Sequence, residues 1–279
     1  MGDRTRSDEA QEASRLDDGL ADVGTALSSI PHFGTKAGRA IRTAIDDVID
    51  PVRTGRWSVA QLEKVEKTYI GTRVEITLRS TLNLEQGARM DCLIASHEVD
   101  IKFSIHGKWM IPMEAVGEMC LLVSADDEAS TFSVGLLRAR DEYLTVGGNR
   151  DRKRTLNAQG NAAIEWLVRD GDLPPNPLSQ ISPEQRSALL KIPVGQARVT
   201  ALFRLVTGQP VTRSVVEWAA SQLDPAKRVR DARQQLESEG IRILSGLRVA
   251  DRSEAKAAGI PIPGKDEFVS YRFRDSSRS

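Results

Sequence analysis

The sequence contains few aromatic residues, only two cysteines and no hydrophobic run of membrane-spanning length. Aromatic side chains make up 5% of the 279 residues. Cys92 and Cys120 lie in apolar, strand-like runs and are too few for a disulfide framework. The lack of a long apolar run excludes a membrane-inserted protein, and the polar, acidic start contains no secretory signal. We therefore expect a cytoplasmic protein with a poorly ordered N-terminus over residues 1–20.

Net charge is also absent, because 39 basic residues balance 39 acidic ones. The charges are nevertheless segregated. Residues 1–50 contain six Lys or Arg against ten Asp or Glu, whereas residues 191–250 contain ten against five. The run NRDRKR at 149–154 adds four basic residues and one acidic residue. This distribution predicts a basic face on particular elements, although chance clustering explains any single cluster about as well.

The first half of the chain predicts helices followed by a sheet. Residues 36–50 place apolar side chains at helical intervals before Pro51, and Ser58 with Gln61 has the pattern of a capping box that opens a second helix. Residues 72–82 fit a strand or a helix, and apolar residues at every fourth position favour the helix. Short β-type runs follow at 89–95, 99–105, 117–125 and 131–138.

These β-type runs predict a meander-like sheet flanked by helices, the last of them over about 157–168. The fold class is therefore α/β (α+β) with a mixed sheet, in a first domain over residues 21–172. The run RDGDLPPNPLSQISPEQR at 169–186 has the proline, glycine and aspartate density of a linker, which we place at residues 173–183. A second domain then extends over residues 184–279.

The second domain is predicted to be mainly helical. Helices are expected over 196–207, from Thr212 to Ala220, and from an N-cap at Asp224 with Pro225 to a stop at Gly240. Strands at 241–249 and 267–273, joined by a loop rich in proline and glycine, complete it. Three helices followed by a two-stranded ribbon is the element order of a winged helix-turn-helix.

Two carboxylates and a lysine interrupt the apolar strands of the first domain. In VDIKFSI, Asp100 and Lys102 point to the same face, about 7 Å apart along the strand. A hairpin centred on Ser96 and His97 would place Asp91 directly opposite Lys102, with Asp100 diagonal to it. One small patch would then contain two carboxylates and an ammonium group.

This patch favours a bound divalent cation, because two adjacent carboxylates repel each other unless a cation lies between them. Oxygen ligands suit Mg²⁺, and a lysine beside the ion can stabilise charge on a reacting phosphate. Phosphodiester hydrolysis needs these groups. A plain Asp–Lys ion pair across an edge hairpin accounts for the spacing equally well.

A family resemblance adds to this interpretation. Asp91 followed by Asp100-Ile101-Lys102 resembles the PD-(D/E)xK nuclease core, with Met90 where that core has proline. More specific runs extend from about residue 40 to residue 265 and resemble the NaeI-type restriction endonucleases: RTGRW at 53–57, QLEKVEKTYIGTRVEI at 61–76, VDIKFS at 99–104, GNRDRKR at 148–154 and GQARVTALFRLVTG at 195–208.

The resemblance implies a homodimeric, Mg²⁺-dependent type II restriction endonuclease of the bacterial cytoplasm, with a restriction-endonuclease-like cleavage domain and a C-terminal domain of the catabolite-activator-protein type. It implies that Asp91 and Asp100 are metal ligands, that Lys102 is the catalytic lysine and that Glu75 is a further catalytic acid. Members bind two DNA copies, and one copy stimulates cleavage of the other. The family type recognises GCCGGC, so a G·C-rich palindrome is the expected target.

The helix predicted from Asp224 is the expected DNA reader. Its apolar face leaves Lys227, Arg228, Arg230 and Arg233 largely outward, where arginine can read guanine and lysine can neutralise phosphate. A solvated helix with an Arg233–Glu237 ion pair is the alternative. Cations near a helix N-terminus oppose the helix dipole, which favours the DNA-binding interpretation.

Arg150, Arg152 and Lys153 are further candidates for contacts with the DNA backbone. A DNA-binding regulator whose nuclease-like domain is only structural remains the rival function. No phosphate-binding P-loop motif occurs, so dependence on ATP is not expected.

Overall fold

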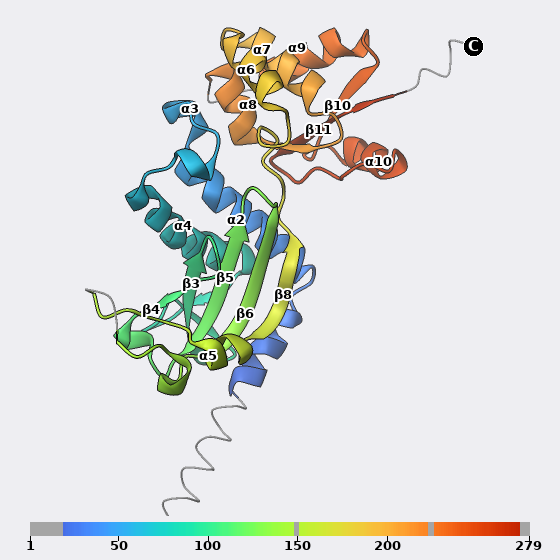
Figure 1. Ribbon diagram of the computed structural model, residues 1–279. Helices are drawn as coiled ribbons and strands as arrows, with labels where there is room; N and C mark the ends of the chain where they lie inside the picture. Colours follow the sequence, from blue (N-terminus) through green and yellow to red (C-terminus); the bar gives the residue numbers. More distant parts are fainter. Residues whose placement is uncertain (1–18, 148–150, 223–225, 274–279) are drawn as a thin grey trace, which may run out of the picture. The chain divides into compact units, whose positions relative to one another are not determined.

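The computed structural model describes residues 19–147, 151–222 and 226–273 (Figure 1). The chain forms two compact units, one of Met1–Val48 with Lys64–Leu173 and the other of Ile49–Glu63 with Pro174–Ser279. Segment 49–63, which the sequence assigns to the first domain, therefore folds with the second unit. No helix in the described residues is both long enough and apolar enough to cross a membrane.

The helices of the first unit follow the apolar periodicity of the sequence. A helix covers residues 19–28, and α2 (Phe33–Ile49) confirms the helix predicted over 36–50. Asp50, with a φ of 43°, separates α2 from the short α3 (Pro51–Thr54). α4 (Lys64–Leu82) buries Ile70, Val74, Leu78 and Leu82, so the helical interpretation of 72–82 is confirmed.

The six-stranded sheet of the first unit has the order β1-β2-β3-β5-β6-β8. Its strands are β1 (Glu85–Gln86), β2 (Cys92–Ile94), β3 (His97–Ser104), β5 (Met119–Asp126), β6 (Thr131–Arg138) and β8 (Glu165–Asp172). β3 and β5 run parallel, whereas the other neighbours are antiparallel. The sheet is mixed, as predicted, and its strands follow one another in chain order. The meander-like connection fails only between β3 and β5, which run parallel.

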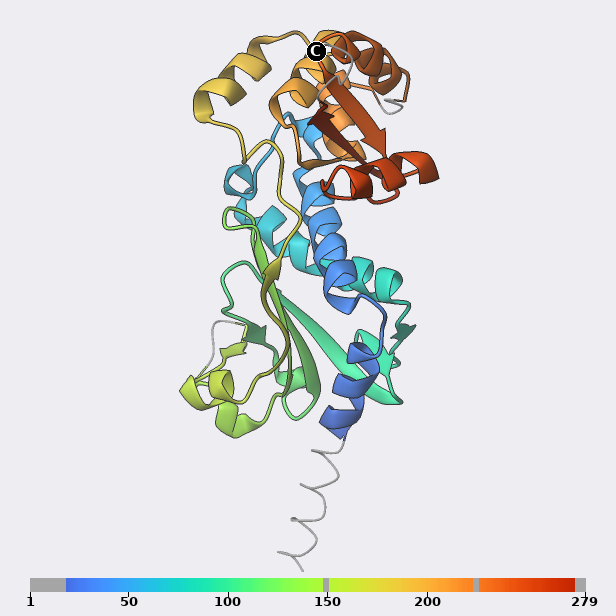
Figure 2. The same ribbon diagram turned by 90° about the vertical axis from the view of Figure 1, so that its right-hand side faces the viewer.

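The two faces of the sheet have different covers. Phe103 of β3 lies beside Gly71 of α4, and Phe132 of β6 lies beside Gly38 of α2, so both helices cover one face (Figure 2). The other face carries Asp100 and Lys102 of β3. Buried side chains of the segments 105–117 and 139–164 cover this face. They pack on Cys120, Leu122 and Leu137 of the strands, and they are Trp109, Ile111, Ala115, Ala139, Leu144 and Ile164.

The helix predicted over about 157–168 is wrong beyond its first turns. α5 (Ala158–Ala162) is capped by the side chain of Asn157, and β8 then follows. Trp166 and Val168 of β8 pair with Gly135 and Val134 of β6. Pairing with an otherwise exposed strand edge outweighs the helical tendency of the alanines before it. A separate two-stranded ladder pairs β4 (Met110–Ile111) with β7 (Arg154–Thr155).

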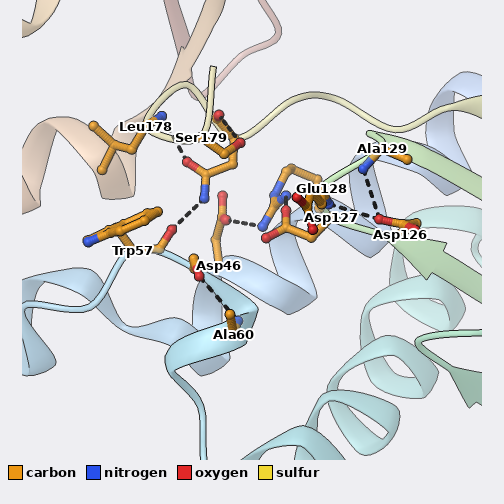
Figure 3. Close-up of polar contacts among 12 residues, drawn as sticks. Asp46, Trp57, Ala60, Asp126, Asp127, Glu128, Ala129, Leu178 and Ser179 are labelled. Carbon is orange, nitrogen blue, oxygen red and sulfur yellow. Dashed lines mark hydrogen bonds and ion pairs between the residues drawn. The ribbon is translucent and has the colours of Figure 1, made fainter. Parts of the chain in front are cut away.

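A buried ion cluster links α2 to the turn between β5 and β6. The Arg42 side chain is only 2% exposed; it lies 2.7 Å from Asp46 and also pairs with Asp127. The turn itself is fixed by Asp126, whose Oδ1 accepts hydrogen bonds from the backbone N–H groups of Glu128 and Ala129 (Figure 3). A buried arginine requires carboxylate partners, because an unpaired buried charge strongly destabilises a fold.

The second unit combines helices with a small antiparallel sheet. α6 (Pro183–Lys191), α7 (Gln196–Leu205), α8 (Arg213–Ala220), α9 (Ala226–Glu237) and α10 (Val249–Ala257) surround the sheet β10-β11-β9, formed by Ile241–Ser245, Glu267–Arg272 and Pro210–Thr212. The helices expected over 196–207 and from Thr212 to Ala220 are confirmed. Asp224 and Pro225 lie outside the described residues.

Three predicted features of the second unit change in the structure. The capping box of Ser58 and Gln61 is present, but it opens only the 3-10 turn η1 (Val59–Gln61). The segment between the last two strands, predicted as a loop, contains α10, and β9 adds a third strand. The backbone carbonyl of Trp57 accepts a hydrogen bond of 2.5 Å from Asn176 (Figure 3), which anchors segment 49–63.

Candidate active site

The β2–β3 hairpin positions the predicted catalytic residues. Ala95 and Ser96 both have positive φ, at 49° and 67°, and form a two-residue turn of the kind that fits twisted strands. Cys92 pairs with Val99 and Ile94 with His97. Continuing this register by one residue places Asp91 opposite Asp100. The predicted placement directly opposite Lys102 is therefore wrong by two residues.

Asp91 is held by backbone contacts at the start of β2. Its Oδ2 accepts a hydrogen bond of 2.7 Å from the backbone N–H of Ile101 on β3. The guanidinium of Arg79, in the last turn of α4, donates to the backbone carbonyl of Asp91 at 2.9 Å. These contacts fix the carboxylate of Asp91 beside the middle of β3.

Glu98 holds the loop that leads to Asp91. Its carboxylate accepts hydrogen bonds from the backbone N–H groups of Ala88, Arg89 and Met90, at 2.9, 3.3 and 2.9 Å. These hydrogen bonds lower the pKa of Glu98. The role could not be predicted from the sequence, because it depends on the loop folding back over β3. The only signal was a further acid in the strand, two residues before Asp100.

Asp100 and Lys102 form a close ion pair on one face of β3. The Nζ of Lys102 lies 2.8 Å from each carboxylate oxygen of Asp100. The side chain of Asp100 is 9% exposed and that of Lys102 is 21% exposed. Alternation along the strand places both on the face of Cys120 and Leu122, as the sequence predicts.

Glu75 on α4 joins these groups electrostatically. Burial raises the pKa of Glu75 to about 7; Asp91 and Asp100 contribute, while Lys102 and Arg79 oppose the shift. Burial also raises the pKa of Asp100 to about 6, with Lys102 opposing and Asp91 adding to the shift. Three carboxyl groups thus lie close enough to disfavour one another's ionisation. A bound cation would relieve this repulsion.

The carboxyl groups around Lys102 stabilise its charged form. Burial acts to lower the pKa of its ammonium group, but Asp100, Asp91 and Glu75 outweigh burial and the pKa is raised. The lysine therefore remains a cation at neutral pH. Cys92 and Cys120 are buried free thiols whose pKa values burial raises to about 12, so neither is a nucleophile at neutral pH.

The donor set fits Mg²⁺ better than a cation that needs many protein ligands. In the described part of the chain, no group of three or more His, Cys, Asp and Glu side chains converges closely enough to hold a metal by itself. Mg²⁺ commonly uses one or two carboxylates together with waters and substrate phosphates. The Oδ2 of Asp100 is buried and lies 2.8 Å from the Nζ of Lys102, and a carboxylate oxygen with that one contact retains a lone pair for a cation.

The predicted DNA-reading residues of α9 differ in their surroundings. Val229, Ala232 and Leu236 are buried, as the sequence predicts, and Lys227 and Arg230 are exposed. Arg228 is half-buried, and its carbonyl accepts a hydrogen bond from Gln196. Arg233 instead donates to the carbonyl of Ile243 at 2.8 Å and pairs with Asp251 at 3.1 Å, so the predicted alternative of a pair with Glu237 is wrong.

The second basic cluster is described only in part. Arg152 and Lys153 are exposed, and Arg150 lies outside the described residues. Of the histidines near the hairpin, His97 lies 3.5 Å from Asp22, and His106 is exposed after β3. Among the residues that the structure describes, neither histidine belongs to a group of three or more possible metal ligands.

Comparisons with known proteins identify the family of this chain. The model of the family described as restriction endonuclease NaeI matches residues 22–279. The type II restriction enzyme NaeI of Lentzea aerocolonigenes is 38% identical to this chain over 267 residues, which cover 92% of this chain and 84% of that protein. The matched region contains Glu75, Asp91, Asp100 and Lys102.

Proposed function

This chain belongs to the NaeI restriction endonuclease family, and we propose that it is a type II restriction enzyme that hydrolyses phosphodiester bonds of double-stranded DNA at a specific site. The observation that carries this proposal is the convergence of Asp91, Asp100 and Lys102, with the lysine 2.8 Å from both oxygens of Asp100. A structural ion pair alone gives no reason for the additional carboxylates of Asp91 and Glu75.

Asp91 and Asp100 are the residues that would hold Mg²⁺. When bound, the ion supplies Lewis-acid polarisation of the scissile phosphate. The hydrogen bond from Ile101 orients the carboxylate of Asp91, and the contact with Lys102 orients that of Asp100. The chain thereby sets both carboxylates before substrate arrives, which lowers the reorganisation needed for the reaction.

Lys102 would stabilise the charge that develops on the phosphate. Its ammonium remains protonated beside three carboxyl groups, and a fixed cation in a partly buried site interacts more strongly than one in water. When ionised, Glu75 would add to the negative field that holds the protonated lysine and that would hold the metal. The electrostatic coupling of Glu75 to Lys102, Asp91 and Asp100 supports this role.

The second unit would be a winged-helix domain that binds a second DNA copy, with α9 as the helix that reads the major groove. The element order α7-α8-α9 followed by β10 and β11 supports this assignment. By family membership we further propose a homodimer, stimulation by the second DNA copy and a G·C-rich palindrome as target, with GCCGGC the sequence to try first. The cleavage domain would comprise residues 21–172 apart from segment 49–63, with 173–183 as the linker.

Digestion of plasmid DNA tests the proposal. We expect the purified full chain with Mg²⁺ to cut supercoiled plasmid into discrete fragments, and sequencing of their ends should give one palindrome. EDTA should abolish cutting. A plasmid that stays intact in Mg²⁺, while the protein still binds DNA, would favour the rival assignment as a DNA-binding regulator.

A further inference from the structure

A cationic pocket of about 250 Å³ lies within the second unit. Four arginines line it: Arg213 from α8, Arg230 and Arg233 from α9, and Arg248 from the segment between β10 and α10. Its apolar lining includes Val229, Leu247 and Phe268. The pocket therefore combines guanidinium groups with apolar surface, and only two of its arginines belong to the set that the sequence selects for DNA.

The charges of this pocket are only partly neutralised. Arg213 lies 2.9 Å from Glu217, and Arg233 lies 3.1 Å from Asp251. Within the described residues, the guanidinium groups of Arg230 and Arg248 have no ion pair or hydrogen bond. Within the described residues, two of the four guanidinium groups therefore lack a carboxylate partner, and an anion is the ligand that would pair with them.

We propose that this pocket binds one nucleotide unit of a DNA backbone, with its phosphate on Arg230 and Arg248 and its deoxyribose against Leu247 and Phe268. The inference rests on the proposed function and assigns a docking point for the second DNA copy. Guanidinium forks match phosphate oxygens bidentately, which an ammonium group cannot do. Apolar lining adds nothing to the binding of inorganic phosphate, but it suits the sugar of a nucleotide.

The surroundings of Arg248 support a ligand larger than a free anion. Leu247 and Val249, on either side of it, are 60% and 69% exposed. Two exposed aliphatic side chains around an unpaired arginine are poorly suited to contact with water alone. A sugar-phosphate backbone would cover the apolar groups and neutralise the arginine in one contact.

Arg233 acts as a positioning residue in this pocket and not as a reader of bases. Asp251 accepts hydrogen bonds from Arg233 and from the backbone N–H of Ser245, at 3.1 and 2.7 Å. Arg233 also donates to the carbonyl of Ile243. These contacts fix the segment after β10 to α9, and they therefore set where Arg248 lies relative to Arg230.

Binding by the full chain tests the inference without catalysis. In EDTA, with a fluorescent duplex and a series of KCl concentrations, Arg248→Ala should reduce the slope of log affinity against log salt by about 0.9. Near 0.1 M salt its affinity should fall about five- to tenfold, equally for cognate and scrambled duplexes. Lys191→Ala, which removes an exposed cation on α6 outside the pocket, is the matched control and should keep the parent slope.

Two further arms identify the ligand and the role of Arg233. Thymidine monophosphate at millimolar concentration should compete with the duplex better than inorganic phosphate does, and Arg248→Ala should remove that difference; equal competition by the two would overturn the assignment to a nucleotide unit. A double-mutant cycle of Arg233→Ala and Arg248→Ala should be non-additive in DNA affinity, whereas a merely structural role for Arg233 predicts additivity. Plasmid cleavage is scored separately: if the parent cleaves but Arg248→Ala keeps the parent slope and affinity, the pocket assignment fails and the enzyme assignment stands.

Discussion

Lys102 and Asp100 show how far single residues could be interpreted from the sequence. Strand alternation in VDIKFSI was sufficient to place the two side chains on one face, and the 2.8 Å contact follows from it. The position of Asp91 was not predictable in the same way. It depends on a turn formed by Ala95 and Ser96, two residues that seldom adopt positive φ, so the sequence contained no turn signal to fix the register.

Replacing Lys102 should separate catalysis from binding. Lys102→Ala removes the cation that stabilises the reacting phosphate, and we expect single-turnover cleavage to slow about 10²–10³-fold. Duplex affinity measured in EDTA should change little. Lys108→Ala, an exposed lysine after the same strand, is the control and should cleave like the parent. Near-normal cleavage by Lys102→Ala would remove this lysine from the active site.

Glu98 offers a test of positioning. Glu98→Ala removes the acceptor that holds the backbone of residues 88–90, so Asp91 should move relative to Asp100. We expect cleavage to fall about 10- to 100-fold, since small misplacements of reacting groups have effects of that size. Glu98→Gln retains one acceptor oxygen and should lose less activity. Equal activity of both variants and the parent would show that the loop does not position Asp91.

At the level of elements, periodicity identified the long helices but not all that they bury. The apolar repeat of 36–50 predicted α2, whereas Arg42 gave no sign that it would be buried, because Arg–Asp pairs one turn apart usually lie on the surface. Its second partner, Asp127, comes from a turn distant in sequence. In the same way α10, which buries only Ala255, lacked the apolar stripe that reveals a helix.

Arg42 should be among the most sensitive positions of the first unit. Arg42→Ala leaves the carboxylates of Asp46 and Asp127 without their buried partner, and we expect it to lower the free energy of unfolding by about 3–5 kcal/mol. Arg39→Ala, on the exposed side of α2, should cost less than about 1 kcal/mol. Urea denaturation measures both. A loss in Arg42→Ala no larger than in Arg39→Ala would mean that the cluster does not stabilise the fold.

In the whole molecule, segment 49–63 belongs to the second unit although it lies in the first half of the sequence. Trp57 packs on the core of the second unit, and the guanidinium of Arg186 lies 3.9 Å from the centre of its ring. A chain cut near Pro174 would therefore deprive the second unit of part of its own structure. A single predicted boundary between residues 172 and 184 could not reveal this arrangement. Segment 49–63 precedes that boundary in the sequence but folds with the unit that follows it. Substitutions in the full chain are the appropriate tests.

Two-copy binding should appear in cleavage kinetics. A plasmid with one target site should be cut slowly, and an added cognate duplex should accelerate it, because the second unit would then be occupied. Arg230→Ala with Arg248→Ala should weaken this stimulation. A scrambled duplex is the control. Equal rates on plasmids with one and two sites, with or without duplex, would show that the second unit has no activating role.

Cleavage by Asp100→Asn tests the central claim most directly. The substitution preserves the size of the side chain but removes the charge that Lys102 contacts and that would hold Mg²⁺. Parent and variant should be compared on the same supercoiled plasmid in Mg²⁺, with duplex binding measured in parallel. We predict that the parent produces discrete fragments, and that the variant binds DNA with parent-like affinity while leaving the plasmid intact. Cleavage of the plasmid by Asp100→Asn at the parent rate would contradict the assignment of this site.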